Sequence, residues 1–242
     1  MTINLIPKVN FKNKKMTKKY TFISDTHNKH NHLTSNGMGN ILGSGDVLIH
    51  SGDCTSLGRR HEIVNFLDWL ANTDYEHKIF IAGNHDFGFE HQTEIAEEYK
   101  EKGVIYLFDS EVVIDGVKFY GSPWQPEFHN WAFNLPRGER LAEKWAKIPD
   151  NTDVLITHGP AHGMLDWTLS GQIVGCEDLF NRIIEIQPKI HVCGHIHCAY
   201  GQKYFNETEF LNASVLNEQY QYQNPPIKIV FDVDDKKIVE YL

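Results

Sequence analysis

Short apolar runs recur along the chain, and each ends in a polar segment rich in Gly, Asn, Asp or Ser. Runs of this length and punctuation are typical of buried strands. They predict strands at residues 20–24, 47–50, 78–82, 104–108, 154–157 and 189–193. Two hairpins are also predicted, one turning at Asp115-Gly116 between 112–114 and 117–120, the other at Asp234-Asp235 between 227–233 and 236–241.

Between some of these strands, apolar residues recur three or four positions apart. This spacing gives a helix one apolar face, and it predicts helices at 60–71, 92–102, 139–147 and 177–186. Helices that alternate with strands and hairpins indicate an α/β (α+β) fold, a four-layer sandwich of two mixed β-sheets flanked by helices. No internal repeat or linker divides the sequence, so we expect one domain over residues 20–242.

Charge is distributed unevenly along the 242 residues. Residues 1–19 carry six lysines and no acid, and we expect this basic leader to be disordered. The net charge is -9, and subtracting these six charges leaves about -15 on the remainder. A body this acidic disfavours long nucleic acids, which need many Lys or Arg on one face. A small phosphorylated ligand remains compatible if metal ions supply local positive charge.

The sequence also carries signals about compartment. No apolar stretch has the length of a membrane span or of a signal-peptide core, so we expect no membrane partner. The four cysteines form no C-x-x-C pair, which is typical of reduced thiols; they are Cys54, Cys176, Cys193 and Cys198. We therefore expect a cytoplasmic protein.

Histidine is unusually frequent, with 14 copies, and several lie beside Asp, Asn or Gly where a predicted strand ends. Five such segments are Asp25-Thr26-His27, Gly52-Asp53, Gly83-Asn84-His85-Asp86, Thr157-His158-Gly159 and Gly194-His195-Ile196-His197. In an extended backbone, residues two apart point to the same face. Asp25 can therefore ligate together with His27, and so can His195 with His197.

These side chains offer carboxylate oxygen, amide oxygen and imidazole nitrogen. That mixture suits Mn, Fe, Zn, Co or Ni and is too rich in nitrogen for Mg or Ca alone. Each segment by itself is a weak signal, but five of them at strand ends predict a site for two divalent metal ions. Two metals about 3.5–4 Å apart can hold a bridging hydroxide and clamp a phosphate for in-line attack.

The order of these five segments resembles that of the calcineurin-like metallophosphoesterase superfamily, from about residue 20 to the C-terminus. Further runs are similar to one branch, the metallophosphoesterase-domain-containing proteins. They are Gly121-Ser122-Pro123-Trp124, Asn130-Trp131-Ala132-Phe133-Asn134-Leu135-Pro136-Arg137-Gly138, Ile156-Thr157-His158-Gly159-Pro160, Leu211-Asn212-Ala213-Ser214-Val215 and Asn224-Pro225-Pro226-Ile227. The run that begins at Asn130 is specific to the branch, whereas Asp-x-His and Gly-Asp belong to the whole superfamily.

The resemblance implies a role for each segment. It assigns metal one to Asp25, His27, Asp53 and His197, and metal two to Asp53, Asn84, His158 and His195. Asp53 would bridge the two ions. His85 would face the substrate phosphate and either protonate the leaving oxygen or stabilise its charge.

Two positions depart from the family pattern. Asp86 stands after His85 where this branch is expected to have Glu, although the shorter acid can still orient the imidazole. Protein phosphatases of the superfamily carry Asp-Arg-Gly shortly after the bridging Asp, and this sequence instead reads Cys54-Thr55-Ser56-Leu57-Gly58 after Asp53. The absence of that element argues against a phosphoprotein phosphatase.

The leading hypothesis is a phosphodiesterase that hydrolyses small diesters such as cyclic nucleotides by attack of a metal-bridging hydroxide. A phosphomonoesterase or broad phosphoesterase uses the same residues, and a nucleotide-binding regulatory protein with weak catalysis is a rival from another class. Trp124, Trp131 and Trp167 either line a nucleobase pocket or belong to the core, and His162 either contacts substrate or is a plain loop residue. The natural substrate, metal identity and oligomeric state are left open by the sequence.

Overall fold

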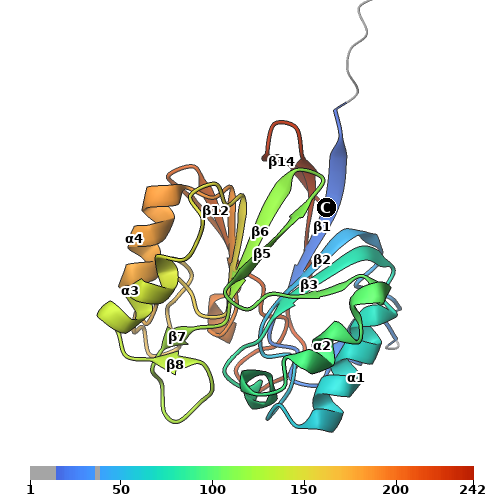
Figure 1. Ribbon diagram of the computed structural model, residues 1–242, viewed down its shortest axis with the longest axis horizontal. Helices are drawn as coiled ribbons and strands as arrows, with labels where there is room; N and C mark the ends of the chain where they lie inside the picture. The colour runs from blue at the N-terminus through green and yellow to red at the C-terminus, as the bar shows by residue number, and fades with distance from the viewer. Residues whose placement is uncertain (1–14, 36–38) are drawn as a thin grey trace, which may run out of the picture.

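The computed structural model describes residues 15–35 and 39–242. Over these residues, two six-stranded mixed sheets lie between pairs of helices, with α1 and α2 beside one sheet and α3 and α4 beside the other (Figure 1). The strand orders are β14-β13-β1-β2-β3-β4 and β11-β12-β10-β9-β6-β5. The predicted sandwich of two mixed sheets flanked by helices is therefore confirmed.

The first sheet has a parallel centre. Its strands are β1 (Thr17–Ile23), β2 (Gly45–Ser51), β3 (Tyr75–Ile81), β4 (Val104–Tyr106), β13 (Ile227–Asp232) and β14 (Lys237–Tyr241). Strands β1 to β4 are parallel, and β13 runs antiparallel to β1. Strand β1 already begins at Thr17, and Thr17 and Lys18 pair with Asp232 and Phe231 of β13. The last residues of the expected leader therefore belong to the sheet. The expectation for residues 1–14 lies outside the described residues.

The second sheet consists of β5 (Ser110–Ile114), β6 (Val117–Ser122), β9 (Val154–Thr157), β10 (Ile190–Cys193), β11 (Gly201–Phe205) and β12 (Thr208–Asn212). A separate small pair is formed by β7 (Gln125–Pro126) and β8 (Asn134–Leu135). The β11–β12 hairpin was not predicted from the sequence. Its turn residues, Asn206 and Glu207, both have positive φ (46° and 69°). Such turns are usually signalled by Asn-Gly or Asp-Gly, and Glu gives no such signal.

The main core lies between the two sheets. Phe22, Ile49 and Ile79 point inward from the first sheet, and Phe119, Ile156 and Val192 from the second. Residues one position away, such as Leu48 and Phe80, point outward and are covered by helices. Because these strands are buried on both faces, they are continuous apolar runs in the sequence rather than alternating ones.

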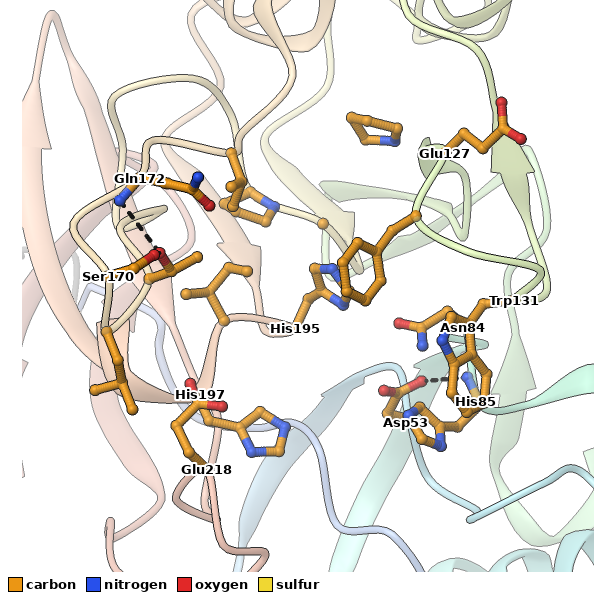
Figure 2. Close-up of a pocket in the computed structure, with 18 of the residues that line it drawn as sticks. Asp53, Asn84, His85, Glu127, Trp131, Ser170, Gln172, His195, His197 and Glu218 are labelled. Carbon is orange, nitrogen blue, oxygen red and sulfur yellow. Dashed lines mark hydrogen bonds between the residues drawn. The ribbon is translucent and has the colours of Figure 1, made fainter.

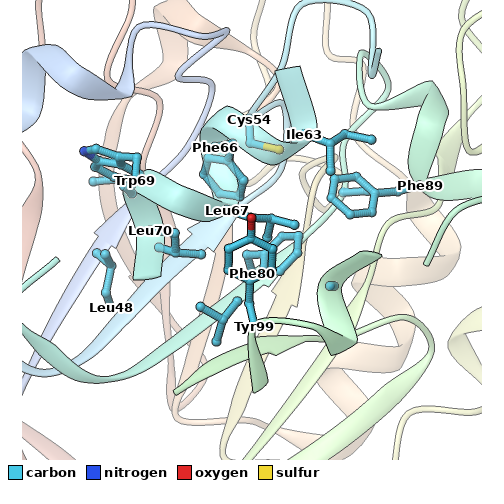
Figure 3. Close-up of a cluster of buried hydrophobic side chains, with 14 of the residues drawn as sticks. Leu48, Cys54, Ile63, Phe66, Leu67, Trp69, Leu70, Phe80, Phe89 and Tyr99 are labelled. Carbon is cyan, nitrogen blue, oxygen red and sulfur yellow. The ribbon is translucent and has the colours of Figure 1, made fainter. Parts of the chain in front are cut away.

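The helices are α1 (Arg60–Ala71), α2 (Glu94–Glu97), α3 (Glu139–Trp145) and α4 (Glu177–Ile186), with 3-10 turns at His30–Leu33, Phe87–Glu90, Lys100–Lys102 and His197–Ala199. Phe66 on α1 contacts Phe80 edge-to-face, with ring centroids 5.5 Å apart (Figure 3). On the other side, Trp145 of α3 and Leu179 and Ile183 of α4 pack on the second sheet.

The helix predicted at 92–102 is wrong in length. The structure has the short α2, then a break at Tyr99 (φ -103°, ψ 0°), and a 3-10 turn that ends at Gly103 with φ 76°. Only Ile95, Ala96 and Tyr99 of this stretch are buried among the described side chains. Too little apolar area is buried here to stabilise a long helix.

The parallel strands place their carboxyl ends at one end of the sandwich. There the two sheets are joined by a bridge between Ser24 and Ser214 and by a hydrogen bond from the amide of Val215 to the carbonyl of Ser24 (3.1 Å). The loops that follow β1, β2, β3, β9 and β10 are thereby brought together.

Candidate metal centre

The five histidine-containing and aspartate-containing segments predicted from the sequence follow β1, β2, β3, β9 and β10, and backbone hydrogen bonds link them. The amide of Asp25 donates to the carbonyl of Gly52, and that of His27 to Asp53, both at 3.0 Å. In the second sheet, the amide of Gly194 donates to the carbonyl of His158, also at 3.0 Å. These bonds fix the spacing of the side chains at the centre.

Left-handed backbone occurs at four of the seven predicted ligands. The φ angles are 54° at Asp25, 40° at His27, 55° at Asp53 and 67° at His195. This conformation is costly for residues other than glycine, and it concentrates at functional sites where the surroundings enforce it. Asp25 and His27 thus converge through a turn, so the prediction that they project from one face of an extended strand was wrong in its geometry.

Two glycines allow the loops to approach closely. A Cβ atom on Gly194 would lie 2.2 Å from the Asp25 carboxylate, and one on Gly83 would lie 2.3 Å from the Asp53 carboxylate. Any larger residue would displace a predicted ligand.

The predicted ligands form two neighbouring groups. Asp25, His27 and His197 have ligand atoms within 4.8 Å of one another, and so do Asp53, His158 and His195. His195 and His197 fall into different groups, because His195 adopts positive φ and His197 begins a 3-10 turn. The grouping agrees with the division between two metals that the family resemblance implies.

Asp53 lies between the two groups. Its Oδ2 is 3.3 Å from Nε2 of His158 and 3.6 Å from Nε2 of His27. Its Oδ1 accepts a hydrogen bond from the amide of His85 at 2.8 Å. Asn84 joins the second group, with Oδ1 3.0 Å from Nε2 of His158. This position is the one that a bridging carboxylate needs.

Backbone carbonyls orient three of the imidazoles. Nδ1 of His158 donates to Ser51, Nδ1 of His197 to Asn217, and Nδ1 of His85 to Ser56, each at 2.9 Å. A carbonyl only accepts, so Nδ1 carries the hydrogen in each ring. Nε2 is then left to face the centre, which is the usual arrangement of a metal-binding histidine.

Buried charges at the centre compensate one another. Burial disfavours the charged form of His158, yet Asp53 outweighs it and raises the pKa of His158 to about 9. Asp25 acts in the same way against the burial of His197, whose pKa is also raised to about 9. Burial would raise the pKa of Asp25, but the neighbouring imidazoles hold it well below its usual range.

The surroundings of the His27 ring indicate whether these side chains fit a metal ion. Burial lowers the pKa of His27 to about 4, so the ring is neutral at physiological pH. Both of its ring nitrogens are buried without a hydrogen-bond partner among the described residues. A buried polar atom left unpaired costs about 1–3 kcal/mol, and a cation bound by Nε2 would remove that cost. The mixture of carboxylate, amide and imidazole donors therefore fits divalent transition metals.

Asp86 has a different role from the expected one. Its carboxylate accepts hydrogen bonds from the amides of Thr55 and Gly83, both at 2.8 Å, and from the hydroxyl of Thr55 at 2.6 Å. The ring of His85 is instead oriented by the Ser56 carbonyl. Asp86 is thus a buried brace between the loops that follow β2 and β3.

A pocket of about 720 Å³ opens from the centre. Figure 2 shows Asp53, Asn84 and His85 at one end and Ser170 and Gln172 across the cavity. Among the tryptophans, Trp131 lines the pocket and stacks on His85, with centroids 4.2 Å apart.

The other open candidates lie outside this pocket. Trp124 packs against Phe133, and its indole nitrogen donates a hydrogen bond to Asp109 at 3.0 Å. Trp167 is 42% exposed and pairs with Ile173. His162 is exposed, and its Nδ1 lies 3.9 Å from a carboxylate oxygen of Glu177.

Several residues that line the pocket were not predicted as site residues from the sequence. They are Pro126, Glu127, Phe128, Arg137, Leu169, Glu218 and Tyr220. Tyr220 contacts the His27 ring edge-to-face at 4.8 Å. Arg137 lies within the branch-specific run that begins at Asn130, and this run is the sequence signal that could have indicated it.

Comparison with known proteins gives the family. Residues 18–199 match the family model described as calcineurin-like phosphoesterase. The chain belongs to the calcineurin-like phosphoesterase family. Metallophosphoesterase domain-containing protein 1 of Homo sapiens is 42% identical over 235 residues, covering 87% of this chain and 70% of the relative, and the Mus musculus protein has the same values. Both predictions from resemblance, the superfamily and the branch, are thereby confirmed.

Solved structures confirm the fold of this calcineurin-like domain. One crystal structure superposes with a TM-score of 0.66 at 14% identity, covering 93% of this chain and 98% of the other. The TT1561 protein of Thermus thermophilus superposes with a TM-score of 0.60 at 13% identity, covering 94% and 99%. Calcineurin-like phosphoesterases use a two-metal centre, and candidate ligand groups for one are present here. Within the described residues, no helix is both long and apolar enough to cross a bilayer.

Asp53→Asn is expected to lower the content of both metals and to remove most phosphoesterase activity, because the substitution keeps the size but removes the charge between the two groups. Wild-type protein should hold two metal equivalents by elemental analysis. Asp150→Asn is the matched control, since the Asp150 side chain is 89% exposed and is not among the predicted ligands. Normal metal content in Asp53→Asn would contradict the central position of this carboxylate.

Metal uptake is expected to release protons. The pKa values of His158 and His197 are raised to about 9 in the metal-free protein, so both rings are largely protonated at pH 7. Binding through Nε2 requires the neutral ring, and metal ions therefore displace these protons. Release should approach two protons at pH 7 and fall as the pH rises through 9. Calorimetry in buffers of different ionisation enthalpy measures this, and a pH-independent binding constant over this range would refute it.

Proposed function

We propose that this protein is a two-metal phosphodiesterase that hydrolyses small phosphate diesters, with cyclic nucleotides as the first class to test. The observation that carries the proposal is the position of His85 beside both ligand groups at one end of the pocket. The metals would be held by Asp25, His27, Asp53 and His197, and by Asp53, Asn84, His158 and His195. When bound, such ions activate water and neutralise phosphate charge, and Mn, Fe, Zn, Co and Ni all suit this donor set.

His85 is suited to proton transfer at the ester oxygen. Its Nδ1 is held by the Ser56 carbonyl, so Nε2 is the nitrogen that remains for the substrate. The indole of Trp131 lies nearly parallel to the ring, with an interplanar angle of 29°, and limits its rotation. A positioned imidazole of this kind protonates a leaving alkoxide, or stabilises its charge through a hydrogen bond.

The shape of the pocket favours an ester with a sizeable organic group. Its volume of about 720 Å³ falls in the range of small-molecule sites and far exceeds that of a phosphate group. Phe128 and Leu169 line it and are 53% and 75% exposed, so apolar surface is available to a nucleoside or another organic alcohol.

The charge of the pocket favours a diester over more highly charged esters. Glu127 and Glu218 line it. Arg137 lines it too, but its guanidinium donates to the carbonyls of Val174 and Gly175 at 2.6 and 2.7 Å. A diester brings one negative charge, whereas monoesters and polyphosphates bring more and meet these carboxylates. Long nucleic acids are disfavoured for the same reason.

We place this activity in the cytoplasm. Cys54, Cys176 and Cys193 are buried free thiols, and Cys198 is a partly buried one. Unpaired cysteines are typical of proteins from reducing compartments.

His85→Ala is expected to lower kcat by roughly 10²–10⁴, the usual contribution of a positioned acid or base, while the metal content stays at two equivalents. The loss should be smaller for nitrophenyl esters, because nitrophenolate leaves without a proton. His129→Ala, which changes an exposed histidine, is the control. A loss independent of the leaving-group pKa would assign His85 to electrostatic stabilisation rather than proton transfer.

Substrate preference tests the diesterase proposal directly. We expect cyclic nucleotides and bis-nitrophenyl phosphate to have kcat/KM values above those of simple monoesters, phosphopeptides and single-stranded DNA, with weak dependence on the base. A preference of more than about tenfold for any of the latter group, about 1.4 kcal/mol of transition-state stabilisation, would replace the diesterase assignment. A preference for monoesters would favour the phosphomonoesterase alternative, and metal binding without turnover would favour a regulatory protein.

A further inference from the structure

The orientation of His85 depends on a loop. The Ser56 carbonyl that accepts from Nδ1 of His85 lies between β2 and α1, where the protein phosphatases of the family carry Asp-Arg-Gly. A backbone carbonyl can fix a ring only if its own loop is fixed. The groups that hold Ser56 therefore decide how well His85 is placed.

Two buried carboxylates hold this loop, one at each side of Ser56. Asp86 accepts from the amides of Cys54 and Thr55 at 3.2 and 2.8 Å. Glu62 accepts through Oε2 from the amides of Arg59 and Leu57 at 2.9 and 3.3 Å. Both carboxylates thus bind backbone amides directly adjacent to the segment that carries Ser56.

Asn28 connects Glu62 to Ser56 from the other side. Its Nδ2 donates to Oε1 of Glu62 at 2.6 Å and to the hydroxyl of Ser56 at 2.9 Å. Its own amide donates to the carbonyl of Cys54 at 3.1 Å. Asn28 follows His27 and has φ 64°, so the loop after β1 is tied to the loop after β2 at the centre.

A capping role alone does not account for Glu62. A carboxylate at the first turn of α1 can cap helix amides, and Oε2 does so. Its other oxygen, however, accepts from Asn28 rather than from the helix. Glu62 is only 7% exposed, and burial opposes its charged form, but hydrogen bonds from Arg59, Asn28 and Leu57 keep its pKa below the usual value. An ionised, buried carboxylate with both oxygens engaged is a rigid anchor.

We propose that Glu62 and Asn28 are positioning residues for His85, acting through the Ser56 loop in place of the acid that protein phosphatases carry there. This inference rests on the proposed function. Neither residue lines the pocket, so neither contacts substrate. Removal of either should loosen the Ser56 carbonyl and with it the Nδ1–H bond of His85.

Asn28→Gly and Glu62→Gln test the proposal. Glycine accepts the left-handed φ of residue 28 and removes only the side chain. The amide of glutamine retains one acceptor where Glu62 uses two. Each variant should lower kcat roughly tenfold on alkyl diesters and cyclic nucleotides, within the lower range for proton transfer, and change it little on nitrophenyl esters. KM and metal content should stay unchanged. Glu97→Gln, with a side chain 72% exposed, is the matched control.

A double-mutant cycle separates positioning from general damage to the fold. In a His85→Ala background, Asn28→Gly should have no further effect on kcat, because the residue it positions is absent. A dependence on the leaving group that differs from that of His85→Ala, or full additivity with His85→Ala, would overturn the proposal. Thermal unfolding of each variant identifies a loss that arises from instability.

A spectroscopic measurement tests the inference without turnover. The Nδ1–H proton of His85 should exchange slowly in metal-loaded wild-type protein by NMR, and faster in Asn28→Gly and Glu62→Gln but not in Glu97→Gln. Unchanged exchange in both variants would refute positioning. If wild-type protein hydrolyses no phosphate ester, the proposed function fails, while this measurement still decides whether Glu62 and Asn28 hold the ring.

Discussion

The structure depends on compensation among buried charges where the two sheets meet. Asp25 and Asp53 are almost inaccessible, and they stay ionised there because the protonated imidazoles of His197 and His158 lie beside them. Removing one partner from such a cluster leaves an unpaired buried charge, which is strongly destabilising. The fold therefore has to bring residues of both sheets together, and the Ser24–Ser214 bridge and the hydrogen bond from Val215 to Ser24 contribute to this.

The backbone at the centre is shaped by that requirement. Asp25, His27, Asp53 and His195 all adopt positive φ, a conformation that raises the energy of each residue. Close contacts at Gly83 and Gly194 leave no room for larger residues. The sheets behind these loops are packed with Phe22, Ile156 and similar side chains, and this rigid core stabilises the strained turns.

Backbone carbonyls in the surrounding loops orient the imidazoles of the centre. Ser51, Ser56 and Asn217 each offer a carbonyl to Nδ1 of one imidazole, so three rings present Nε2 inward. The pocket beyond them is lined by loop segments that follow strands of both sheets, and few of its other groups are recognisable as ligands. Its acids and apolar side chains, Glu127, Phe128 and Leu169 among them, bear on which ester fits rather than on the chemistry.

Local patterns were enough to predict the sandwich and every strand of the two sheets except β11 and β12, because buried strands are short apolar runs. The candidate ligands were predicted in the same way, since each stands in a short segment directly after a strand. The sequence also determined the family, through the order of those segments. The tertiary structure alone decided which ligands share a group, since that depends on positive φ at His195 and on loops far apart in the chain. It likewise decided that Asp86 braces a loop, that Ser56 orients His85, and that Trp124 lies outside the pocket. The β11–β12 hairpin and the shortness of α2 escaped the sequence because Asn206-Glu207 carries no turn signal and helix length depends on tertiary burial.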